Sequence, residues 1–407
     1  MSKFSTHTRG VARAVSDRPD LETLSTLVRH IAAGSVVTRA TLAQQTQLAR
    51  STVSQRVETL LAAGLIVEDG TAPSRGGRPA LRLRLNPNAG LILTADLGAT
   101  RAMLAVSDLG GQRLASTTED NDIDKDPERV LGWVDQRFGE LLAEAGCEAR
   151  QVQAITIGVP GPVEASTGTV VRPPLMRRWD GYRVPAYFAE RYPAQTVVDN
   201  DVNLMALGEH QQCYPEMAHL LFVKIGTGIG CGVIIDGKLH RGAAGSAGDI
   251  GHIRVPDSEA ECWCSNSGCL EAMAGGKALV QRLSKHGLAV ATAGDVARLA
   301  AEGNQRAIQE VRSAVQHIGG VLAAIVSFAN PEAVIIGGSL ARLDETLLAG
   351  IRSAIYERAL PLATRSLHIE TSTLGEEAGT TGAVSLAQER ILSPAGIAAL
   401  LSPRDSA

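Results

Sequence analysis

The chain has 407 residues, of which 44% are hydrophobic and 20% are charged, a composition typical of soluble globular proteins with two or three domains. No apolar run reaches the roughly 18–20 residues of a membrane span, and the N-terminal residues lack the apolar core of a signal peptide. Apart from one cluster, the six cysteines are scattered, which argues against a disulfide framework. We therefore expect a cytoplasmic protein with no membrane partner.

Charge is unevenly distributed along the chain. Residues 1–90 hold 12 Lys and Arg against 6 Asp and Glu, a net charge of +6. The remaining residues hold 27 against 37, a net charge of −10, so that the two parts sum to −4. A basic head on an acidic body suggests that the head meets a polyanion, although an ordinary solvated basic face would give the same charge.

Three short helices are expected in the basic head, within residues 21–64. Gly34 follows the first, Thr38 is a plausible N-cap of the second, and Gly64 ends the third. Their inward positions are Leu21, Leu24, Leu27, Val28, Ile31, Leu42, Val53, Val57, Leu60 and Leu61. Strands are expected in residues 65–70 and 80–86. This order predicts a winged helix-turn-helix over residues 21–88, with residues 1–20 as a flexible N-terminal arm.

The third helix and the wing carry the candidate DNA-binding residues. Donors suited to phosphates and base edges face outward on the helix: Arg50, Ser51, Thr52, Ser54, Gln55 and Arg56. In the wing, Arg75 and Arg78 flank two glycines and precede Pro79, a pattern that fits a narrow minor groove. A flexible linker is the alternative interpretation of this glycine-containing stretch.

The body, residues 90–390, repeats one pattern of strands and glycine turns. Three strands are expected in residues 91–116, and residues 219–242 repeat this plan. A glycine turn follows the first strand of each set and could hold phosphate on backbone N–H groups, although most such turns are only tight turns. The candidates are Asp96, Gly98, Thr100, Gly226, Thr227 and Gly228.

Asp201 follows a short apolar strand and precedes a helical stretch. An Asp at this place is often only a helix N-cap. The ends of strands in open α/β sheets are also where ligand groups collect, and a carboxylate there could act as general base toward a sugar hydroxyl. Both roles remain open from the sequence.

Residues 261–271 read ECWCSNSGCLE and contain three cysteines within eight residues. Together with His252, the thiols of Cys262, Cys264 and Cys269 make up the donor set of a closed tetrahedral zinc site. Reduced core cysteines beside an unrelated histidine are the alternative. Four protein ligands leave no open position, so we expect a structural zinc ion that fixes a loop and orients His252.

At these residues the sequence resembles the ROK family of repressors and sugar kinases. The resemblance spans residues 90–390 and rests on Gly251-His252, the cysteine spacing, Gly268-Cys269-Leu270-Glu271, Asn200-Asp201-x-Asn203 and the GVPGPV stretch from Gly158. The added head, with Gly77-Arg78-Pro79, resembles that of the repressor branch, which includes the xylose and N-acetylglucosamine regulators.

The resemblance implies an α/β, actin-like (ribonuclease H-like) two-lobed fold of the ATPase and sugar-kinase type. The expected boundaries are 89–205 for lobe 1, 206–390 for lobe 2 with the zinc loop and a last helix returning to lobe 1, and 391–407 for a loosely ordered C-terminal tail. It also implies a sugar in the cleft between the lobes, bound by Asn200, Asp201, Asp249, His252 and Glu271, with Asp201 as the catalytic base only if the protein is a kinase.

The chain departs from the family pattern at three places. Ala99 and Arg101 replace a glycine and a lysine of the first phosphate loop, which makes binding of ATP and Mg²⁺ doubtful. Asp249 replaces a glutamate, which puts the identity of the sugar in question. Ser265 replaces a glycine of the zinc loop, the departure expected to matter least.

These observations favour a sugar-responsive transcriptional regulator, and among regulators they favour a repressor of carbohydrate uptake or metabolism genes. Its expected partners are a double-stranded DNA operator, a sugar or sugar phosphate effector, and further copies of itself in a homodimer or homotetramer. The alternatives are an ATP-dependent sugar kinase with a fused DNA-binding domain, and a DNA-bound protein that answers to another protein. Residues 315–329 could form an oligomer interface, although a buried core helix fits that apolar run better.

Overall fold

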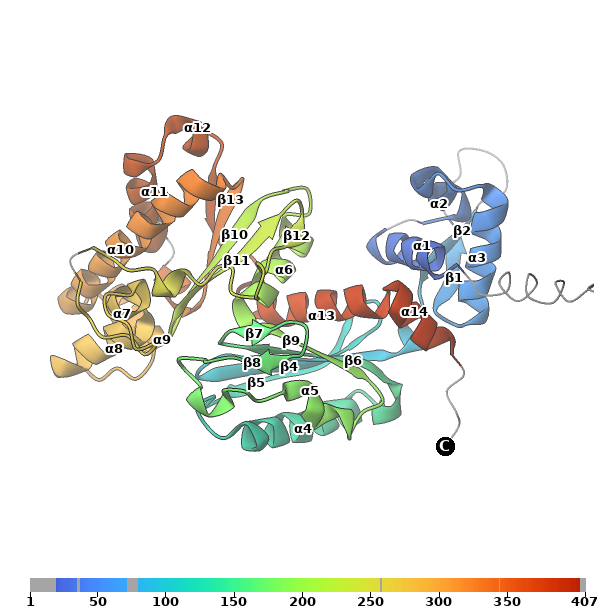
Figure 1. Cartoon of the computed structure of the whole chain (residues 1–407), viewed down its shortest axis with the longest axis horizontal. Coiled ribbons are helices and arrows are strands. Elements are labelled where there is room, and N and C mark those ends of the chain that lie inside the picture. Colours follow the sequence, from blue (N-terminus) through green and yellow to red (C-terminus); the bar gives the residue numbers. More distant parts are fainter. Residues whose placement is uncertain (1–19, 35–36, 72–79, 257, 344, 403–407) are drawn as a thin grey trace, which may run out of the picture. The chain divides into compact units, whose positions relative to one another are not determined.

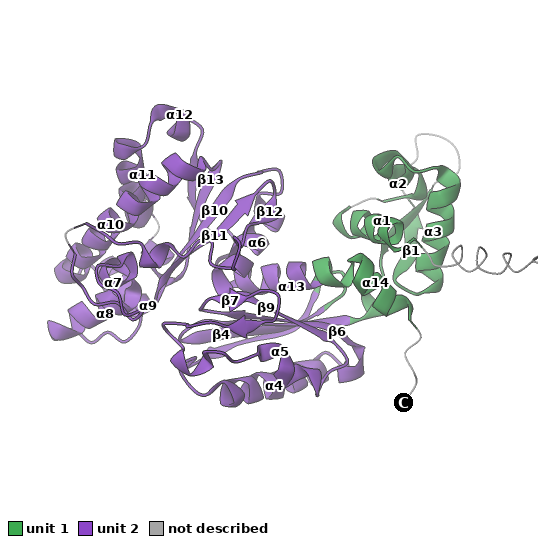
Figure 2. Cartoon of the chain, in the orientation of Figure 1, with its two compact units in different colours: residues 1–90, 108–112, 388–407 green, residues 91–107, 113–387 purple. Residues whose placement is uncertain are grey.

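The computed structural model of the chain describes residues 20–402 except 35–36, 72–79, 257 and 344. It divides into two compact units (Figure 2). Unit 1 comprises residues 1–90, 108–112 and 388–407, and unit 2 comprises residues 91–107 and 113–387. The expected N-terminal arm lies outside the described residues except for Asp20, which caps the first helix.

Unit 1 contains the three expected helices, α1 (Leu21–Ala33), α2 (Arg39–Thr46) and α3 (Arg50–Ala62). Thr38 and Thr41 form a reciprocal capping box at the start of α2, as the N-cap prediction required. Gln47 and Gly64 adopt left-handed backbone conformations at the turns that follow α2 and α3. The predicted inward residues are buried except for Leu21 and Leu61, which are partly buried.

A short antiparallel ladder completes the head. Strand β1 (Ile66–Thr71) pairs with β2 (Leu81–Leu85), and an isolated bridge joins Val37 to Leu83. Leu65 and Ile66 enter the core beneath the helices. A helix-turn-helix followed by a two-stranded wing is therefore present in the described residues. The predicted minor-groove contacts Arg75 and Arg78 lie outside those residues.

The C-terminal segment differs from the loosely ordered tail that the sequence suggested. Residues Pro394–Leu401 form helix α14, which contacts α1 and buries Ile397 completely. Ser25 Oγ donates a hydrogen bond of 2.6 Å to the carbonyl of Leu392. The prediction failed because this helix is stabilised by contacts with residues more than 350 positions away in the sequence, which no local pattern reveals.

Unit 2 contains two five-stranded sheets with equivalent strand orders (Figure 1). In the first, the order is β5-β4-β3-β6-β9, and in the second it is β12-β11-β10-β13-β14. In both sheets the three strands of the predicted repeat are antiparallel, and two parallel strands follow on the other side. This correspondence confirms the duplication predicted from the glycine turns.

The strands of the first sheet are β3 (Leu91–Leu97), β4 (Arg101–Asp108), β5 (Arg113–Asp120), β6 (Val152–Val159) and β9 (Gln195–Asn200). Those of the second are β10 (Leu220–Ile225), β11 (Ile229–Ile235), β12 (Lys238–Leu239), β13 (Ala333–Gly337) and β14 (His368–Thr371). A separate ladder pairs β7 (Val163–Glu164) with β8 (Thr169–Val170).

Helices flank both sheets and enclose their apolar cores. The first sheet is accompanied by α4 (Pro127–Glu144) and α5 (Val184–Ala189), and α6 (Asp201–Cys213) follows β9 directly. The second is accompanied by α7 (Leu270–Ala274), α8 (Gly276–Lys285), α9 (Ala293–Ala301), α10 (Gln305–Ala329), α11 (Glu345–Arg358) and α12 (Pro361–Thr364). Helix α13 (Ala378–Ile391) begins in unit 2, and its residues from 388 onward belong to unit 1. The short 3₁₀ turns are η1 (Pro87–Ala89), η2 (Ala149–Gln151), η3 (Arg177–Trp179), η4 (Ile250–His252), η5 (Ser339–Leu343) and η6 (Gly375–Glu377).

Helix α10 is long and apolar enough to cross a membrane by length and composition alone. Half of its most apolar window is buried inside the protein, and it packs along α11. Ile318, Leu322 and Val326 are fully buried in the core of the second sheet. Helix α10 is therefore a core helix of unit 2, the interpretation that the sequence favoured for residues 315–329.

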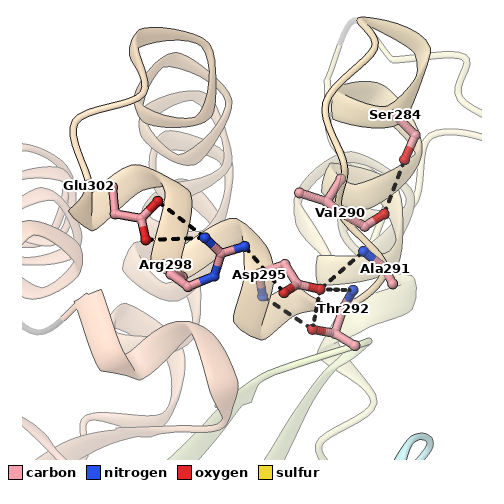
Figure 3. Close-up of polar contacts among 7 residues, drawn as sticks. All are labelled: Ser284, Val290, Ala291, Thr292, Asp295, Arg298 and Glu302. Carbon is pink, nitrogen blue, oxygen red and sulfur yellow. Dashed lines mark hydrogen bonds and ion pairs between the residues drawn. The ribbon is translucent and has the colours of Figure 1, made fainter.

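The start of α9 shows how polar residues fix these connections (Figure 3). Asp295 N donates to Thr292 Oγ1, while Asp295 Oδ2 accepts from the backbone N–H groups of Ala291 and Thr292. These bonds, led by that from Ala291, lower the pKa of the Asp295 carboxyl group. The capping box thereby satisfies backbone donors that would otherwise be unpaired at the helix N-terminus.

Candidate functional site

A cleft of about 750 Å³ lies in unit 2, where the ends of strands from both sheets meet. Such a volume accommodates a small molecule. All five candidate sugar-binding residues line it: Asn200, Asp201, Asp249, His252 and Glu271. Trp263 and Cys264 of the cysteine loop line the same cleft, so that the expected zinc loop forms part of its wall.

The four candidate zinc ligands are brought together beside this cleft. The donor atoms of His252, Cys262, Cys264 and Cys269 all lie within 4.8 Å of one another. His252 Nδ1 is 3.5 Å from Cys262 Sγ, and Cys264 Sγ is 3.7 Å from Cys269 Sγ. Burial, reinforced by the neighbouring thiols, raises the pKa of Cys269 to about 12. One imidazole and three thiols at these distances fit a tetrahedral metal ion, whose charge would favour the thiolate forms.

The backbone of the cysteine loop requires a conformation that its sequence does not favour. Cys262 N donates to the carbonyl of Asn266, and Ser265 N donates to the carbonyl of Cys262. Ser265 turns the chain between them with φ of +74°, in the left-handed region. A side chain other than glycine in this region costs about 1 kcal/mol or more. The departure that the sequence suggested would matter least therefore falls at a strained position.

His252 is shared between the cysteine cluster and the cleft. Its Nδ1 faces the cluster, whereas its Nε2 lies 3.8 Å from Asp249 Oδ1. Glu271, at the start of α7, is nearly buried and accepts a hydrogen bond of 3.0 Å from the backbone N–H of Ile229. Burial raises the pKa of the Glu271 carboxyl group. One imidazole nitrogen and two acidic side chains thus face the same space, as an acceptor set for hydroxyl groups requires.

The sequence suggested that Asp201 could cap α6, but the cap is Asn200. The side-chain oxygen of Asn200 accepts from Val202 N at 3.0 Å, and its amide nitrogen donates to the carbonyl of Gly161 at 3.1 Å. Asp201 is the first residue of the helix itself, and only 4% of its surface is exposed. Asp201 lines the cleft, and its Oδ1 also accepts a hydrogen bond of 2.7 Å from the backbone N–H of Val202.

Lys224 is a cleft residue that sequence reasoning missed. It lies on β10, and its Nζ donates a hydrogen bond of 2.5 Å to Asp201 Oδ2. Burial by itself would lower the pKa of Lys224, but the carboxylates of Asp201 and Asp96 outweigh burial and raise it. In the sequence, Lys224 stands between apolar strand residues and a glycine turn. A single lysine in such a place usually faces solvent, so the sequence gave no signal of a cleft residue.

Sequence reasoning also missed the role of Asp199, which directly precedes the cleft residues Asn200 and Asp201. Asp199 Oδ2 accepts a hydrogen bond of 2.7 Å from Arg241 Nε and lies 2.6 Å from Nη2 of the same guanidinium group, while Oδ1 accepts a hydrogen bond of 2.8 Å from Asn203. Asp199 and Asn203 are buried. The carboxylate thereby ties the end of β9 to Arg241 through a charge-assisted contact and to the start of α6 through Asn203. The only sequence signal was the pattern Asp199-Asn200-Asp201-x-Asn203, which does not name Arg241 as the partner.

The phosphate-loop candidates line a second cavity of about 480 Å³, with one exception. Asp96, Gly98, Thr100, Gly226 and Thr227 all face this second cavity. Gly228 instead lines the first cleft, where a Cβ on it would lie 2.3 Å from Glu271 Oε2. The missing side chain makes room for Glu271, and the phosphate role of Gly228 stays a prediction.

The guanidinium group of Arg101 is engaged in an ion pair at the second cavity. It pairs with Glu376 at 3.2 Å, and Arg342 pairs with the same carboxylate oxygen at 2.6 Å. All three residues line the cavity. This exposed pairing of two cations with one carboxylate is consistent with the doubt about nucleotide binding that Ala99 and Arg101 raised in the sequence.

The DNA-binding candidates on α3 lie on its outer side. Arg50, Ser51, Ser54 and Gln55 are exposed, and Thr52 and Arg56 are partly buried. Arg39 is paired with Glu58 and Glu68, at 2.7 and 2.6 Å, which links α2, α3 and β1. No acidic residue occurs in the first turn of α3. The start of this helix therefore presents positive and neutral donors to a polyanion.

Comparison with known proteins gives consistent matches along most of the chain. The model of the ROK family matches residues 92–390. The xylose repressor of Caldicellulosiruptor bescii is 28% identical over 381 residues, covering 90% of this chain and 95% of that protein. The DNA-binding transcriptional dual regulator NagC of Escherichia coli K12 and the N-acetylglucosamine repressor of Escherichia coli O157:H7 are each 28% identical over 374 residues, covering 88% of this chain and 89% of those proteins.

Solved structures show the same fold. A ROK family transcriptional regulator, a homologue of the E. coli MLC protein, superposes with a TM-score of 0.79 at 24% identity, over 94% of this chain and 98% of that one. A ROK family glucokinase from Streptomyces griseus, in complex with glucose and AMPPNP, gives a TM-score of 0.63 at 27% identity, over 74% and 100%. The expected actin-like two-lobed fold is confirmed.

Proposed function

The chain belongs to the ROK family, and from this premise we propose that it is a sugar-responsive transcriptional regulator of the repressor type. The observation that carries the proposal is the combination of a winged helix-turn-helix with a cleft lined by Asp201, Asp249, His252 and Glu271. Repressors of xylose and N-acetylglucosamine genes match nearly the whole chain, head included. The chain acts in the cytoplasm, where its operator lies.

The cleft is suited to a sugar because it offers many fixed hydrogen-bonding groups in a small, largely buried space. Asn200, Asp201, Asp249, His252 and Glu271 provide acceptors and donors for adjacent hydroxyl groups. When an epimer binds, one of these groups is left unpaired, which reduces affinity. Asp249 is exposed and one methylene shorter than glutamate, so its carboxylate reaches less far toward a sugar hydroxyl than a glutamate would.

A structural zinc ion is the expected resident metal of the cysteine loop. The ligands would be His252, Cys262, Cys264 and Cys269, whose donor set and spacing fit this metal. The ion would close the loop and orient the imidazole. His252 then presents its second nitrogen to the cleft, and Trp263 is fixed at the cleft wall.

Helices α6 and α13 offer a route from the cleft toward the head. Helix α6 begins at Asp201, and α6 and α13 touch through glycines: a Cβ on Gly208 would lie 2.3 Å from the carbonyl oxygen of Ala378. The last residues of α13 belong to unit 1. A sugar that binds one lobe arrangement better than the other shifts the population of that arrangement, and α13 transmits the change to the DNA-binding unit.

Binding of an operator with two half-sites requires at least two copies of the chain. Helix α12 contacts both α10 and α11, and large apolar side chains are exposed on these three helices and next to them. They are Phe328 (93% exposed), Tyr356 (50%), Leu360 (75%) and Leu362 (71%). We assign this surface to contact with a second copy, in a homodimer or homotetramer, and light scattering of Leu360→Glu and Leu362→Glu proteins tests it.

The experiment that tests the regulator proposal is a titration of labelled operator DNA. Genomic sites bound by the protein are mapped first, and fluorescence anisotropy then measures release from those sites by a panel of sugars and sugar phosphates that includes xylose and N-acetylglucosamine. Release by one sugar, lost in a Glu271→Gln variant that still binds DNA, supports the proposal. Sequence-specific DNA binding that no sugar in the panel alters would contradict it.

The second candidate function is a sugar kinase, favoured by one observation. The cleft and the second cavity share Ala99, Lys224 and Thr227 as lining residues, so a nucleotide in one would adjoin a sugar in the other. Incubation of the protein with ATP, Mg²⁺ and a panel of hexoses separates the two functions. Sugar-dependent release of ADP that disappears in an Asp201→Asn variant would establish the kinase.

A further inference from the structure

Lys224 lies at the junction of the two cavities. It lines both, whereas Asp201 lines only the first cleft and Asp96 only the second cavity. Its side chain is three-quarters buried and comes from β10 of the second sheet. Asp96 is on β3 of the first sheet, and Asp201 begins the helix after β9. The ammonium group is thus an ionic link between the two halves of unit 2.

Both carboxylates near this ammonium group are held in place. Lys224 Nζ donates to Asp201 Oδ2 at 2.5 Å, and Asp201 Oδ1 accepts from the backbone N–H of Val202 at 2.7 Å. Asp96 occupies a slot made by glycines: a Cβ on Gly379 would lie 2.0 Å from Asp96 Oδ2, and one on Gly158 would lie 3.1 Å from Oδ1. Asp96 Oδ1 is buried without a hydrogen-bond partner in the protein.

Two carboxylates that face each other across a passage between cavities form the surroundings in which phosphoryl-transfer enzymes hold a divalent cation. Such a cation must contact carboxylate oxygens and the phosphate at once, and the base must be free to take a hydroxyl proton. Here the Lys224 ammonium group already engages Oδ2 of Asp201, and its positive charge also acts on Asp96. The negative charge of the two carboxyl groups is therefore compensated by a lysine of the same chain.

We propose that Lys224 is a built-in counter-ion that takes the place of a divalent cation between Asp96 and Asp201, so that the cleft binds its ligand without metal or nucleotide. The remaining N–H groups of the ammonium provide donors beside the acceptor Asp201, an arrangement that suits two adjacent hydroxyl groups of a sugar. The contact with sugar hydroxyl groups rests on the proposed function, whereas the replacement of the divalent cation by Lys224 does not.

The test is direct binding of Mn²⁺ to the zinc-loaded protein, followed by electron paramagnetic resonance in buffer free of Mg²⁺, sugar and DNA. We expect no Mn²⁺ site in the wild-type cleft. A Lys224→Met variant, of similar length but uncharged, should gain one Mn²⁺ site per chain, because two buried carboxyl groups are left without a cation. Adding Asp201→Asn to this variant should remove the site. Lys238→Met, which removes an exposed lysine of β12, is the matched control and should bind no additional Mn²⁺.

Two results would overturn the proposal. One is a wild-type Mn²⁺ site that is lost on Asp201→Asn substitution, and the other is a folded Lys224→Met protein with no new site. Should the methionine variant fail to fold, Lys224→Gln provides the same comparison, because the amide can still donate to Asp201 without a charge. Neither sugar nor DNA enters this measurement, so a negative Mn²⁺ result does not affect the regulator proposal. Conversely, an operator complex that no sugar alters would contradict the regulator proposal without affecting the Mn²⁺ result.

Discussion

Gly382 of α13 packs directly against the carbonyl group of Leu204 in α6. A Cβ built on Gly382 would lie 1.8 Å from the oxygen of Leu204 and 2.8 Å from the backbone nitrogen of Gly208. Neighbouring apolar residues of both helices, Leu207, Ala383 and Leu386, form one buried cluster. The two helices therefore approach at backbone distance, on the proposed route between the cleft and the head.

Substitution of Gly382 by Ala should reduce the free energy of unfolding by about 3 kcal/mol or more, because the obstructing atoms are backbone and cannot turn aside. Urea denaturation measures the change. Gly139→Ala on α4 is the matched control: a Cβ there meets nothing within 4 Å, so it should be neutral or stabilising by up to about 1 kcal/mol. Equal stability of the two variants would contradict the close helix contact.

Removal of one thiol should release the zinc ion proposed for the cysteine loop. In a Cys264→Ser protein we expect zinc affinity to fall by more than about 100-fold. Removal of a residue that only supports a ligand already costs about 10–100-fold, and Cys264 is a candidate ligand itself. Mass spectrometry of the purified chain measures zinc per protein. Cys147→Ser, outside the cluster, should retain one zinc ion per chain. A wild-type chain without zinc, or a Cys264→Ser chain that keeps it, would refute the metal site.

Ser265→Gly should stabilise the protein by about 0.5–1 kcal/mol, because φ of +74° is unfavourable for serine and accessible to glycine. Thermal unfolding of the zinc-loaded proteins checks this. Ser267→Gly, at a position that pairs with Glu261 in an isolated bridge, serves as control and should be neutral or destabilising. A loss of stability in Ser265→Gly would show that the loop does not need the left-handed conformation.

Arg50, exposed at the start of α3, should contact a DNA phosphate. Replacement by Ala is expected to weaken binding to all sequences alike and to reduce the slope of log K against log salt concentration by about 1. Gln55→Ala should instead relax preference at one base pair by about 1–3 kcal/mol. Arg150→Ala, in the exposed 3₁₀ turn η2 of unit 2, should leave both quantities unchanged. Identical salt slopes for Arg50→Ala and the wild type would exclude the phosphate contact.

Asp96 should make stability depend on pH. Burial raises the pKa of its carboxyl group from 3.8 to about 7, although Lys224 acts in the opposite direction. Between these values the folded chain holds a proton that the unfolded chain has released, so the contribution of Asp96 to stability is present at the acid end and is lost as the pH rises through this window. Urea denaturation from pH 4 to 8 should show this decline in the wild type and not in Asp96→Asn. Parallel curves would contradict it, and Lys224→Met should extend the decline to higher pH.

Local sequence patterns were sufficient for the helix-turn-helix, the duplicated strands and the metal cluster. Thr38, Gly64 and the apolar stripes of α1 and α3 act within a few residues, and three of the four metal donors lie within eight residues. Sequence reasoning failed for α14, which is held by α1, and it gave no sign that the missing side chain of Gly228 accommodates Glu271. Strain at Ser265 also escaped it, because the left-handed turn is imposed by bonds of the closed loop.

The sequence by itself determined which chemical groups are available: basic donors on one helix, four soft ligands near one loop, and acidic groups after strand ends. Only the tertiary structure decided which of these groups share a cavity and with what charge. Lys224 and Arg241 show the difference, since each lies more than 20 positions from the carboxylate it neutralises. Long-range ion pairs depend on how strands and helices pack, and side-chain periodicity along a single segment carries no information about them.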